Sequence, residues 1–125
     1  MLKTITPIDN SVYLERPYAS SSEIENSLEL SNQSKTIWKN TSLEVRKELV
    51  SKFVESFLSN NKEIEEELCR QMGRPISQCS GEMRGFEERA KYMIENADRS
   101  LQKVISKNDS EFDNYIIKEP LGSIF

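Results

Sequence analysis

The chain has 125 residues, which is enough for one domain or for part of a larger one. Charged side chains make up 30% of it, there are only four glycines and four prolines, and the formal net charge is −4. This composition favours helices with one solvated face, and the acidic balance argues against a nucleic-acid groove or an anionic membrane surface, since both attract basic proteins.

Residue types that support catalysis or metal binding are scarce. There is no histidine, which removes the commonest general base, the Ser–His and Cys–His nucleophile pairs and most zinc sites. The two cysteines, Cys69 and Cys79, are separated by ten positions, which matches neither a C-x-x-C motif nor a small disulfide framework. The sequence has no stretch typical of a membrane span and no signal-peptide core, so we expect a cytoplasmic protein with reduced thiols.

The N-terminal residues predict a loosely held strand or hairpin followed by a helix. Two extended pieces within residues 4–17 flank a Pro-Ile-Asp-Asn-Ser turn, because Asp and Asn side chains bond to nearby backbone groups and favour turns. The next helix is expected to start at Ser21 or Ser22, whose hydroxyl accepts from unpaired backbone amides, with Glu23 at the positive end of the dipole. Trp38 is expected to anchor its far end.

Two further helices are predicted in the middle of the chain. After an Asn-Thr-Ser start at 40–42, apolar residues recur with the helical period between Leu43 and Leu58. A third helix begins with Asn61 at its cap position. It ends at Gly73, because a glycine in the left-handed conformation with a proline soon after it stops a helix.

The last part of the chain is predicted to hold one long helix and one strand. The helix runs from about Gly81 to about Ser106 and follows a loop that contains Cys79. A cysteine just before a helix start is expected to have a somewhat lowered pKa. A polar turn at 107–110 follows, and then a strand at Tyr115–Ile117 with no obvious partner in this sequence.

Acidic residues and thiols are weighed as candidate sites and rejected. The four glutamates between positions 63 and 67 would splay around one helix, so a solvated face is favoured over a metal site. Cys69, late in its helix beside Leu68, is expected to be an inert, buried or half-buried thiol. Without histidine, neither Cys69 nor Cys79 is expected to be a nucleophile.

Six features follow one another in a recognisable order. They are the turn at Thr6–Ser11, Trp38 at the end of the first helix, Arg46 near the start of the second, the stop at Met72–Pro75, Glu82 with Arg89 on the long helix, and Glu119–Gly122. This order resembles the N-terminal portion of the NAD(P)-dependent aldehyde dehydrogenase superfamily, over nearly the whole chain. In that family a Glu-Pro-Leu-Gly corner introduces the first strand of the cofactor domain.

The resemblance implies an α/β, Rossmann-type fold for the whole enzyme, of which this segment is the mainly α-helical part with short strands near both ends. Residues 1–19 would form an extended N-terminal arm, and residues 20–110 the helical part of the cofactor-binding domain. Residues 111–122 would form an oligomerisation-type strand and corner, and residues 123–125 the start of the first cofactor-domain strand. We therefore expect the reading frame to continue past Phe125.

The resemblance also implies a reaction: oxidation of an aldehyde to a carboxylic acid by NAD or NADP, through a thiohemiacetal on a cysteine thiolate. The family's nucleophile, glutamate base and glycine-rich cofactor loop lie beyond the Glu-Pro-Leu-Gly corner. This chain is therefore expected to hold no catalytic, cofactor-binding or metal-binding residue and to be inactive by itself. The expected partners are an aldehyde substrate and, in a homodimer or homotetramer, further copies that exchange strands near Tyr115–Ile117. Neither nucleic acid nor membrane is expected.

Two residues of the long helix are expected at the substrate site. By position relative to Arg89, the resemblance places Met83 and Phe86 at the mouth of the substrate tunnel. The residues themselves allow an equally good alternative, in which both are ordinary core residues of that helix.

A second interpretation is a short, non-catalytic helical interaction protein derived from the same family. It would bind a partner through the apolar stripe at Phe53 and Phe57, and it predicts a stop codon after Phe125 and a sharp, cooperative melt. The interpretation as part of an aldehyde dehydrogenase predicts a continuing reading frame and no sharp melt, because the stripe of the isolated chain then lacks the sheet against which it packs.

Overall fold

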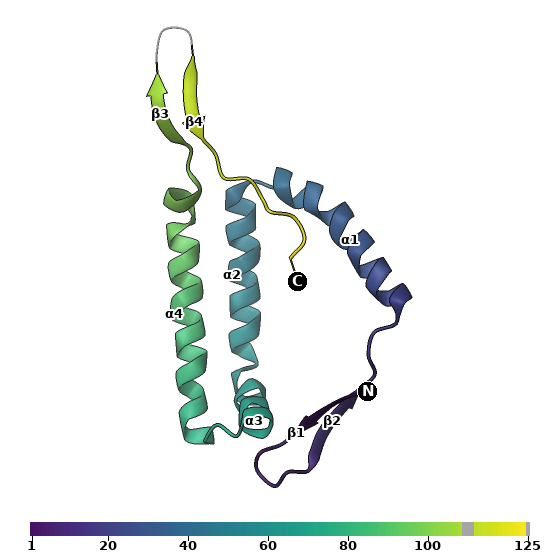
Figure 1. The fold of residues 1–125 in the computed structure, drawn as a ribbon. Helices are drawn as coiled ribbons and strands as arrows, with labels where there is room; N and C mark the ends of the chain where they lie inside the picture. Colours follow the sequence, from purple (N-terminus) through teal and green to yellow (C-terminus); the bar gives the residue numbers. More distant parts are fainter. Residues whose placement is uncertain (109–111, 125) are drawn as a thin grey trace.

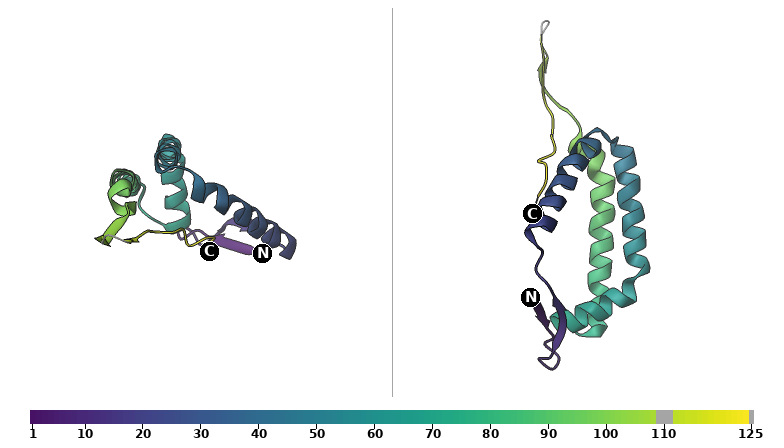
Figure 2. Two further views of the ribbon diagram at one scale, coloured as in Figure 1. Left: turned by 90° about the horizontal axis from the view of Figure 1, so that it is seen from above. Right: turned by 90° about the vertical axis from the view of Figure 1, so that its right-hand side faces the viewer.

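The computed structural model describes residues 1–108 and 112–124 of the chain. The elements in order are β1 (Leu2–Ile5), β2 (Val12–Arg16), α1 (Ser21–Asn40), α2 (Leu43–Ser59), α3 (Asn61–Met72), α4 (Ile76–Leu101), β3 (Val104–Asn108) and β4 (Asp113–Ile116). In Figure 1 and Figure 2, α2 and α4 lie side by side, α3 crosses one end of this pair, and α1 stands apart from it. A strand pair lies at each end of the molecule, so the predicted architecture, mainly helical with short strands near both ends, is confirmed.

The buried core lies where α2 meets α4. Its buried hydrophobic side chains are Val54 of α2 and Cys79 and Met83 of α4. Beside them the rings of Phe57 and Phe86 pack with their centroids 4.6 Å apart. The stripe predicted on the second helix is thus packed only in part: Val54 is buried and Phe57 half-buried, whereas Leu49, Val50 and Phe53 are exposed.

The first helix is capped one residue earlier than the sequence predicts. The Ser20 hydroxyl accepts from the Glu23 amide at 3.3 Å, and the Glu23 carboxylate accepts from the Ser20 amide at 2.8 Å. Ser20 lies three positions before Glu23, which is the spacing that a reciprocal capping box needs. Ser42 caps α2 through its side chain, as expected.

At the next corner Asn60, and not Asn61, occupies the cap position of α3. The Asn60 side chain donates to the carbonyl of Ser56 at 2.9 Å, so it stabilises the end of α2 and makes no cap bond to α3. At the other end of α3, Gly73 has a φ of 69° and ends the helix as predicted.

The long helix is displaced towards the N-terminus relative to its prediction. It begins at Ile76, directly after Pro75, and not at about Gly81. Pro75 is the cap residue, with a ψ of 130°, and its carbonyl accepts from the Gln78 amide at 2.8 Å at the start of the helix. Cys79 therefore lies inside α4, and the predicted loop around it is wrong.

The same helix ends at Leu101 and not at about Ser106, because the residues that follow form a strand. β3 pairs antiparallel with β4, with Val104 opposite Ile116 and Ile105 opposite Tyr115. The strand expected near Tyr115 thus has a partner within the chain, which corrects the prediction that it has none. The β-branched residues Val104 and Ile105 favour this pairing.

Two expectations fall partly outside the described residues. Of the polar turn predicted at 107–110, Lys107 and Asn108 belong to β3, while residues 109 and 110 lie outside the described ranges. Of the strand start predicted at 123–125, Phe125 lies outside them. Ser123 lies beside α1, where its hydroxyl forms a hydrogen bond with that of Ser31.

The N-terminal hairpin is docked on α3. The Tyr13 hydroxyl donates to the Glu67 carboxylate at 2.7 Å, which raises the pKa of Tyr13, and the Arg70 guanidinium lies 5.9 Å from the ring centroid. The turn of the hairpin touches the end of α3, because a Cβ at Gly73 would lie 2.6 Å from the Cγ of Pro7. A glycine is therefore required there both for its positive φ and for the close approach of Pro7.

The chain exposes much more surface than a compact protein of its size. Its solvent-accessible area is 10357 Å², whereas a compact monomer of this mass exposes roughly 6,900 Å². α1 has no buried residue at all. The packed part is confined to α2, α3 and α4.

We expect the isolated chain to melt broadly, because so small a core supports little cooperativity. Far-ultraviolet circular dichroism should show helix loss over a wide temperature range, and calorimetry should show no sharp heat-absorption peak. A steep two-state melt by a monomer would contradict this expectation.

A pair of glycine variants tests the α3 corner. Gly73→Ala should lower the midpoint of urea unfolding, by an amount corresponding to roughly 1–2 kcal/mol, since alanine is strained at positive φ and its Cβ meets Pro7. Gly81→Ala is the matched control, because Gly81 lies inside α4 and a Cβ there would meet no atom within 4 Å. It should raise the midpoint. The midpoints are read from the helical circular dichroism signal, and equal shifts of the midpoint in the two variants would refute this account.

Candidate functional site

An apolar groove runs between α2, α3 and α4 and contains both residues predicted at the substrate site. Its cavity is about 390 Å³. Met83 lies at its floor with 6% of its surface exposed, and Phe86, one turn further along α4, is half-buried. The side chains that line it include Phe57, Ile64, Leu68, Met83, Phe86 and Met93.

Aromatic packing fixes the orientation of Phe86. Its ring lies against Phe57 at 4.6 Å, and it meets Phe53 edge-on with 6.4 Å between centroids and an angle of 85°. Such contacts stabilise one rotamer of each ring. The helical spacing on α4 thus brings Met83 and Phe86 into one groove, where both also contribute to the core.

The rim of this groove is polar. The Glu82 carboxylate forms an ion pair with the Arg74 guanidinium at 2.8 Å, which joins the start of α4 to the corner after α3. Arg89 also lines the groove, one turn after Gly85. The groove therefore offers apolar contact with a charged edge, which suits binding, and none of its lining residues is a nucleophile or a general base in a reactive setting.

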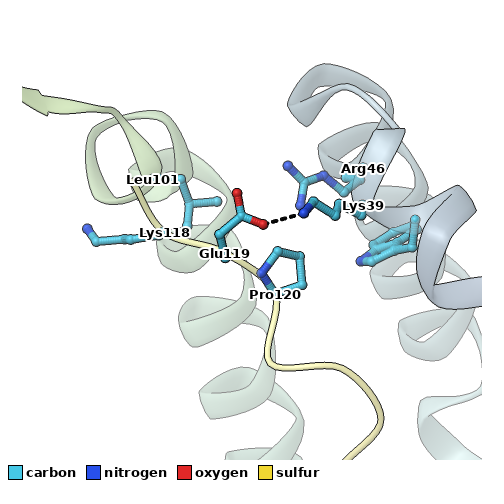
Figure 3. A pocket seen from close by; sticks show the side chains of 7 residues that line it. Lys39, Arg46, Leu101, Lys118, Glu119 and Pro120 are labelled. Atoms are coloured by element: carbon cyan, nitrogen blue, oxygen red, sulfur yellow. Dashed lines mark ion pairs between the residues drawn. The ribbon is translucent and has the colours of Figure 1, made fainter. Parts of the chain in front are cut away.

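A second hollow lies at the other end of the helices, and the sequence analysis did not identify it as a site. It has a volume of about 300 Å³ and is formed where the chain after β4 passes between the end of α4 and the junction of α1 with α2 (Figure 3). The Lys39 ammonium and the Glu119 carboxylate form an ion pair across it at 2.5 Å. Its members come from distant parts of the chain, so no local pattern marks it.

Neither thiol has the surroundings of a nucleophile. Cys79 is fully buried, and its Sγ lies 3.5 Å from the Pro75 carbonyl as a weak donor. Burial raises the pKa of the Cys79 thiol, so the lowered pKa expected from a position before the helix is wrong. The helix begins earlier than predicted, which places Cys79 within it. Cys69 is half-buried, as expected.

In the described ranges, 1–108 and 112–124, no three histidine, cysteine, aspartate or glutamate side chains gather closely enough to hold a metal ion. The glutamates of α3 differ in surroundings. Glu67 accepts hydrogen bonds from Gln71 and Tyr13, which hold its pKa below the usual value, and Glu63, Glu66 and Glu67 are all exposed. Across the same described part of the chain, no helix has both the length and the apolarity to cross a bilayer.

Comparison with protein families identifies the chain. The profile described as "Aldehyde dehydrogenase family" matches residues 1–125, which is its whole length. The chain belongs to the aldehyde dehydrogenase family. Comparison with curated protein sequences gives no significant match.

Solved structures of similar fold include several dehydrogenases. The succinic semialdehyde dehydrogenase of Streptococcus pyogenes, solved with NADP+ as the cofactor, gives a TM-score of 0.82 at 22% identity, over 92% of this chain and 25% of that chain. Gox0499, described for its cofactor and substrate selection, gives a TM-score of 0.85 at 19% identity, over 95% of this chain and 26% of that chain. An NAD-dependent benzaldehyde dehydrogenase from Corynebacterium glutamicum gives a TM-score of 0.75 at 21% identity, over 88% of this chain and 24% of that chain.

These structural matches concern the fold alone, and each involves only part of the other protein. The chain spans about a quarter of the length of the solved chains that it matches. Together with the profile match, they establish that residues 1–125 have the fold of one portion of an aldehyde dehydrogenase.

The burial difference between the two thiols predicts their reactivity. With Ellman's reagent, the Cys79→Ala variant, which retains Cys69, should react faster than Cys69→Ser, which retains Cys79. Because the raised pKa of Cys79 leaves less thiolate at a given pH, its rate should also keep increasing to higher pH. Equal rates and equal pH profiles for the two variants would contradict the burial of Cys79.

Proposed function

We propose that this chain contributes the N-terminal portion of an NAD(P)-dependent aldehyde dehydrogenase. The enzyme would oxidise an aldehyde to a carboxylic acid in the cytoplasm, with one water consumed and one NADH or NADPH formed for each aldehyde. The observation that carries the proposal is the family match over all 125 residues. The dehydrogenases of similar fold, one solved with NADP+ and one NAD-dependent, support it.

The chemical steps are assigned to residues outside this chain. A nucleophilic cysteine needs an accessible thiolate, whereas Cys79 is fully buried and burial raises its pKa. The 125 residues alone are therefore proposed to be inactive. Their contribution would be to pack against the cofactor-binding part and to shape the approach of the substrate.

Met83 and Phe86 are proposed to form the mouth of the substrate tunnel. The support is their position in one apolar groove, whose open side would face an apolar part of the substrate. The alternative, that both residues act only as core, is supported by the burial of Met83 and by the ring contact between Phe86 and Phe57. Kinetics of variants distinguish these two roles.

The pair β3–β4 is proposed to join subunits of a homodimer or homotetramer. This hairpin extends away from the helices in Figure 1, and its strands have no third strand beside them in the described chain. Ile105, Tyr115 and Ile116 are exposed on it. Unpaired strand edges with apolar side chains favour pairing with another chain.

A second candidate function is that of a non-catalytic interaction protein. The observation in its favour is an apolar hollow of about 260 Å³ between α2 and α4, where Val50, Met93 and Ile94 are among the lining residues. Such a surface would bind a partner helix. This function requires the chain to fold alone.

One experiment separates the two functions. Sequencing of the encoding DNA downstream of Phe125 should reveal a continuing frame, and its complete product should form NADH or NADPH from NAD+ or NADP+ with succinic semialdehyde or benzaldehyde. Residues 1–125 alone should form none. A stop codon after Phe125, with a compact monomeric product, would overturn the enzyme assignment.

Variants of the complete enzyme test the tunnel residues. Met83→Ala and Phe86→Ala should change KM for a bulky aldehyde by roughly tenfold with little change in kcat, because they remove apolar contact made equally in ground and transition states. Tyr92→Ala is the matched control, since Tyr92 lies on the same helix outside the groove, with 61% of its surface exposed. Lower melting temperatures with unchanged kinetic constants would assign Met83 and Phe86 to the core alone.

A further inference from the structure

Arg46 lies at the junction of α1, α2 and the chain after β4. Its residue is half-buried, and within the described residues its side chain forms no hydrogen bond and no ion pair. Its Nε is shielded from solvent and has no acceptor in the described part of the chain. An unpaired, buried donor on a charged group costs free energy, so an acceptor from outside the described residues would be stabilising.

The hollow that Arg46 lines has an excess of positive charge. Three of its lining residues, Lys39, Arg46 and Lys118, are cationic, and only Glu119 is anionic. Figure 3 shows Lys39 and Arg46 both extending towards Glu119, whereas Lys118 extends away from it. Lys39 forms the ion pair with Glu119, and the Lys118 ammonium donates to the carbonyl of Ser100. Among the described residues, Arg46 is thus the lining cation whose side chain has neither an ion pair nor a hydrogen bond.

We propose that this hollow binds an oxyanion, a carboxylate or phosphate group, through Arg46. The planar guanidinium presents donors in a fork that matches two oxygens of such a group, and charge-assisted bonds of this kind are among the strong ones in proteins. A volume of about 300 Å³ accommodates a small anion beside Glu119, and Trp38 and Pro120 provide apolar walls. The inference does not depend on the proposed function.

An oxyanion could come from two sources, and either one would accept hydrogen bonds from the Arg46 guanidinium. One is a free anion from solution. The other is a protein carboxylate, such as one from a second copy of the chain. Inorganic phosphate is the probe for the first source, and protein concentration is the variable for the second.

Trp38 provides the signal, because it is the one tryptophan of the chain and lines the hollow. Titration with sodium phosphate, against sodium chloride at equal ionic strength, should change its fluorescence in a saturable manner. Arg46→Met should weaken the apparent affinity for phosphate by about tenfold or more, because a charge-assisted pair is lost. Arg84→Met, the same change at an exposed position of α4, is the matched control and should leave the affinity unchanged.

The second source gives a different pattern. Trp38 fluorescence should then depend on protein concentration in chloride alone, and Arg46→Met should abolish that dependence. The proposal is overturned if neither phosphate nor concentration affects Trp38, or if Arg46→Met responds as the wild type does.

Nuclear magnetic resonance of the wild type keeps the test independent of the variant's folding. Phosphate, or an increase in protein concentration, should shift the Arg46 Nε–H resonance and leave that of Arg84 in place. Equal shifts of both resonances would indicate general screening and would also overturn the proposal.

Discussion

The packing of α2 against α4 is the contact on which the rest of the structure depends. Val54 of α2 and Cys79 and Met83 of α4 are buried, and the rings of Phe57 and Phe86 pack between the same two helices. The Lys47 ammonium pairs with the Asp98 carboxylate at the other end of the two helices and lowers the pKa of Asp98. Exposed pairs of this kind contribute little free energy, so apolar contact between the two helices dominates.

The segments outside α2, α3 and α4 are held by few contacts. The N-terminal hairpin is joined to α3 through Tyr13, Glu67 and the Pro7–Gly73 approach. α1 contacts the chain after β4 through Ser31 with Ser123 and through the Lys39–Glu119 ion pair, and it buries no residue. The large exposed area follows from this arrangement, and it accords with a chain that spans about a quarter of the solved dehydrogenases it matches.

The two hollows of the molecule differ in chemistry because different elements line them. The groove at Met83 and Phe86 lies between helix faces, so periodic apolar residues line it. The hollow at Arg46 lies where helix ends and an extended segment converge, so lysine, arginine and glutamate line it. Met83 and Phe86 thus belong to the packed core as well as to the lining of the groove.

The sequence by itself determined the helices, the N-terminal turn and the family. These features depend on neighbours within one or two turns: the 3.6-residue period of α2, the hydroxyl of Ser42 and the positive φ of Gly73. It also indicated Met83 and Phe86 as residues of one helix face, because their spacing of three positions places them together on α4.

Only the tertiary structure decided the features that need residues far apart in the chain. Whether Val104 and Ile105 end a helix or form a strand depends on pairing with Tyr115 and Ile116, which no local pattern reveals. The burial of Cys79 depends on where α4 begins and on the helices packed around it, and so does the direction of its pKa shift. Arg46 and Glu119 are 73 positions apart, and their meeting in one hollow follows from the path of the chain after β4.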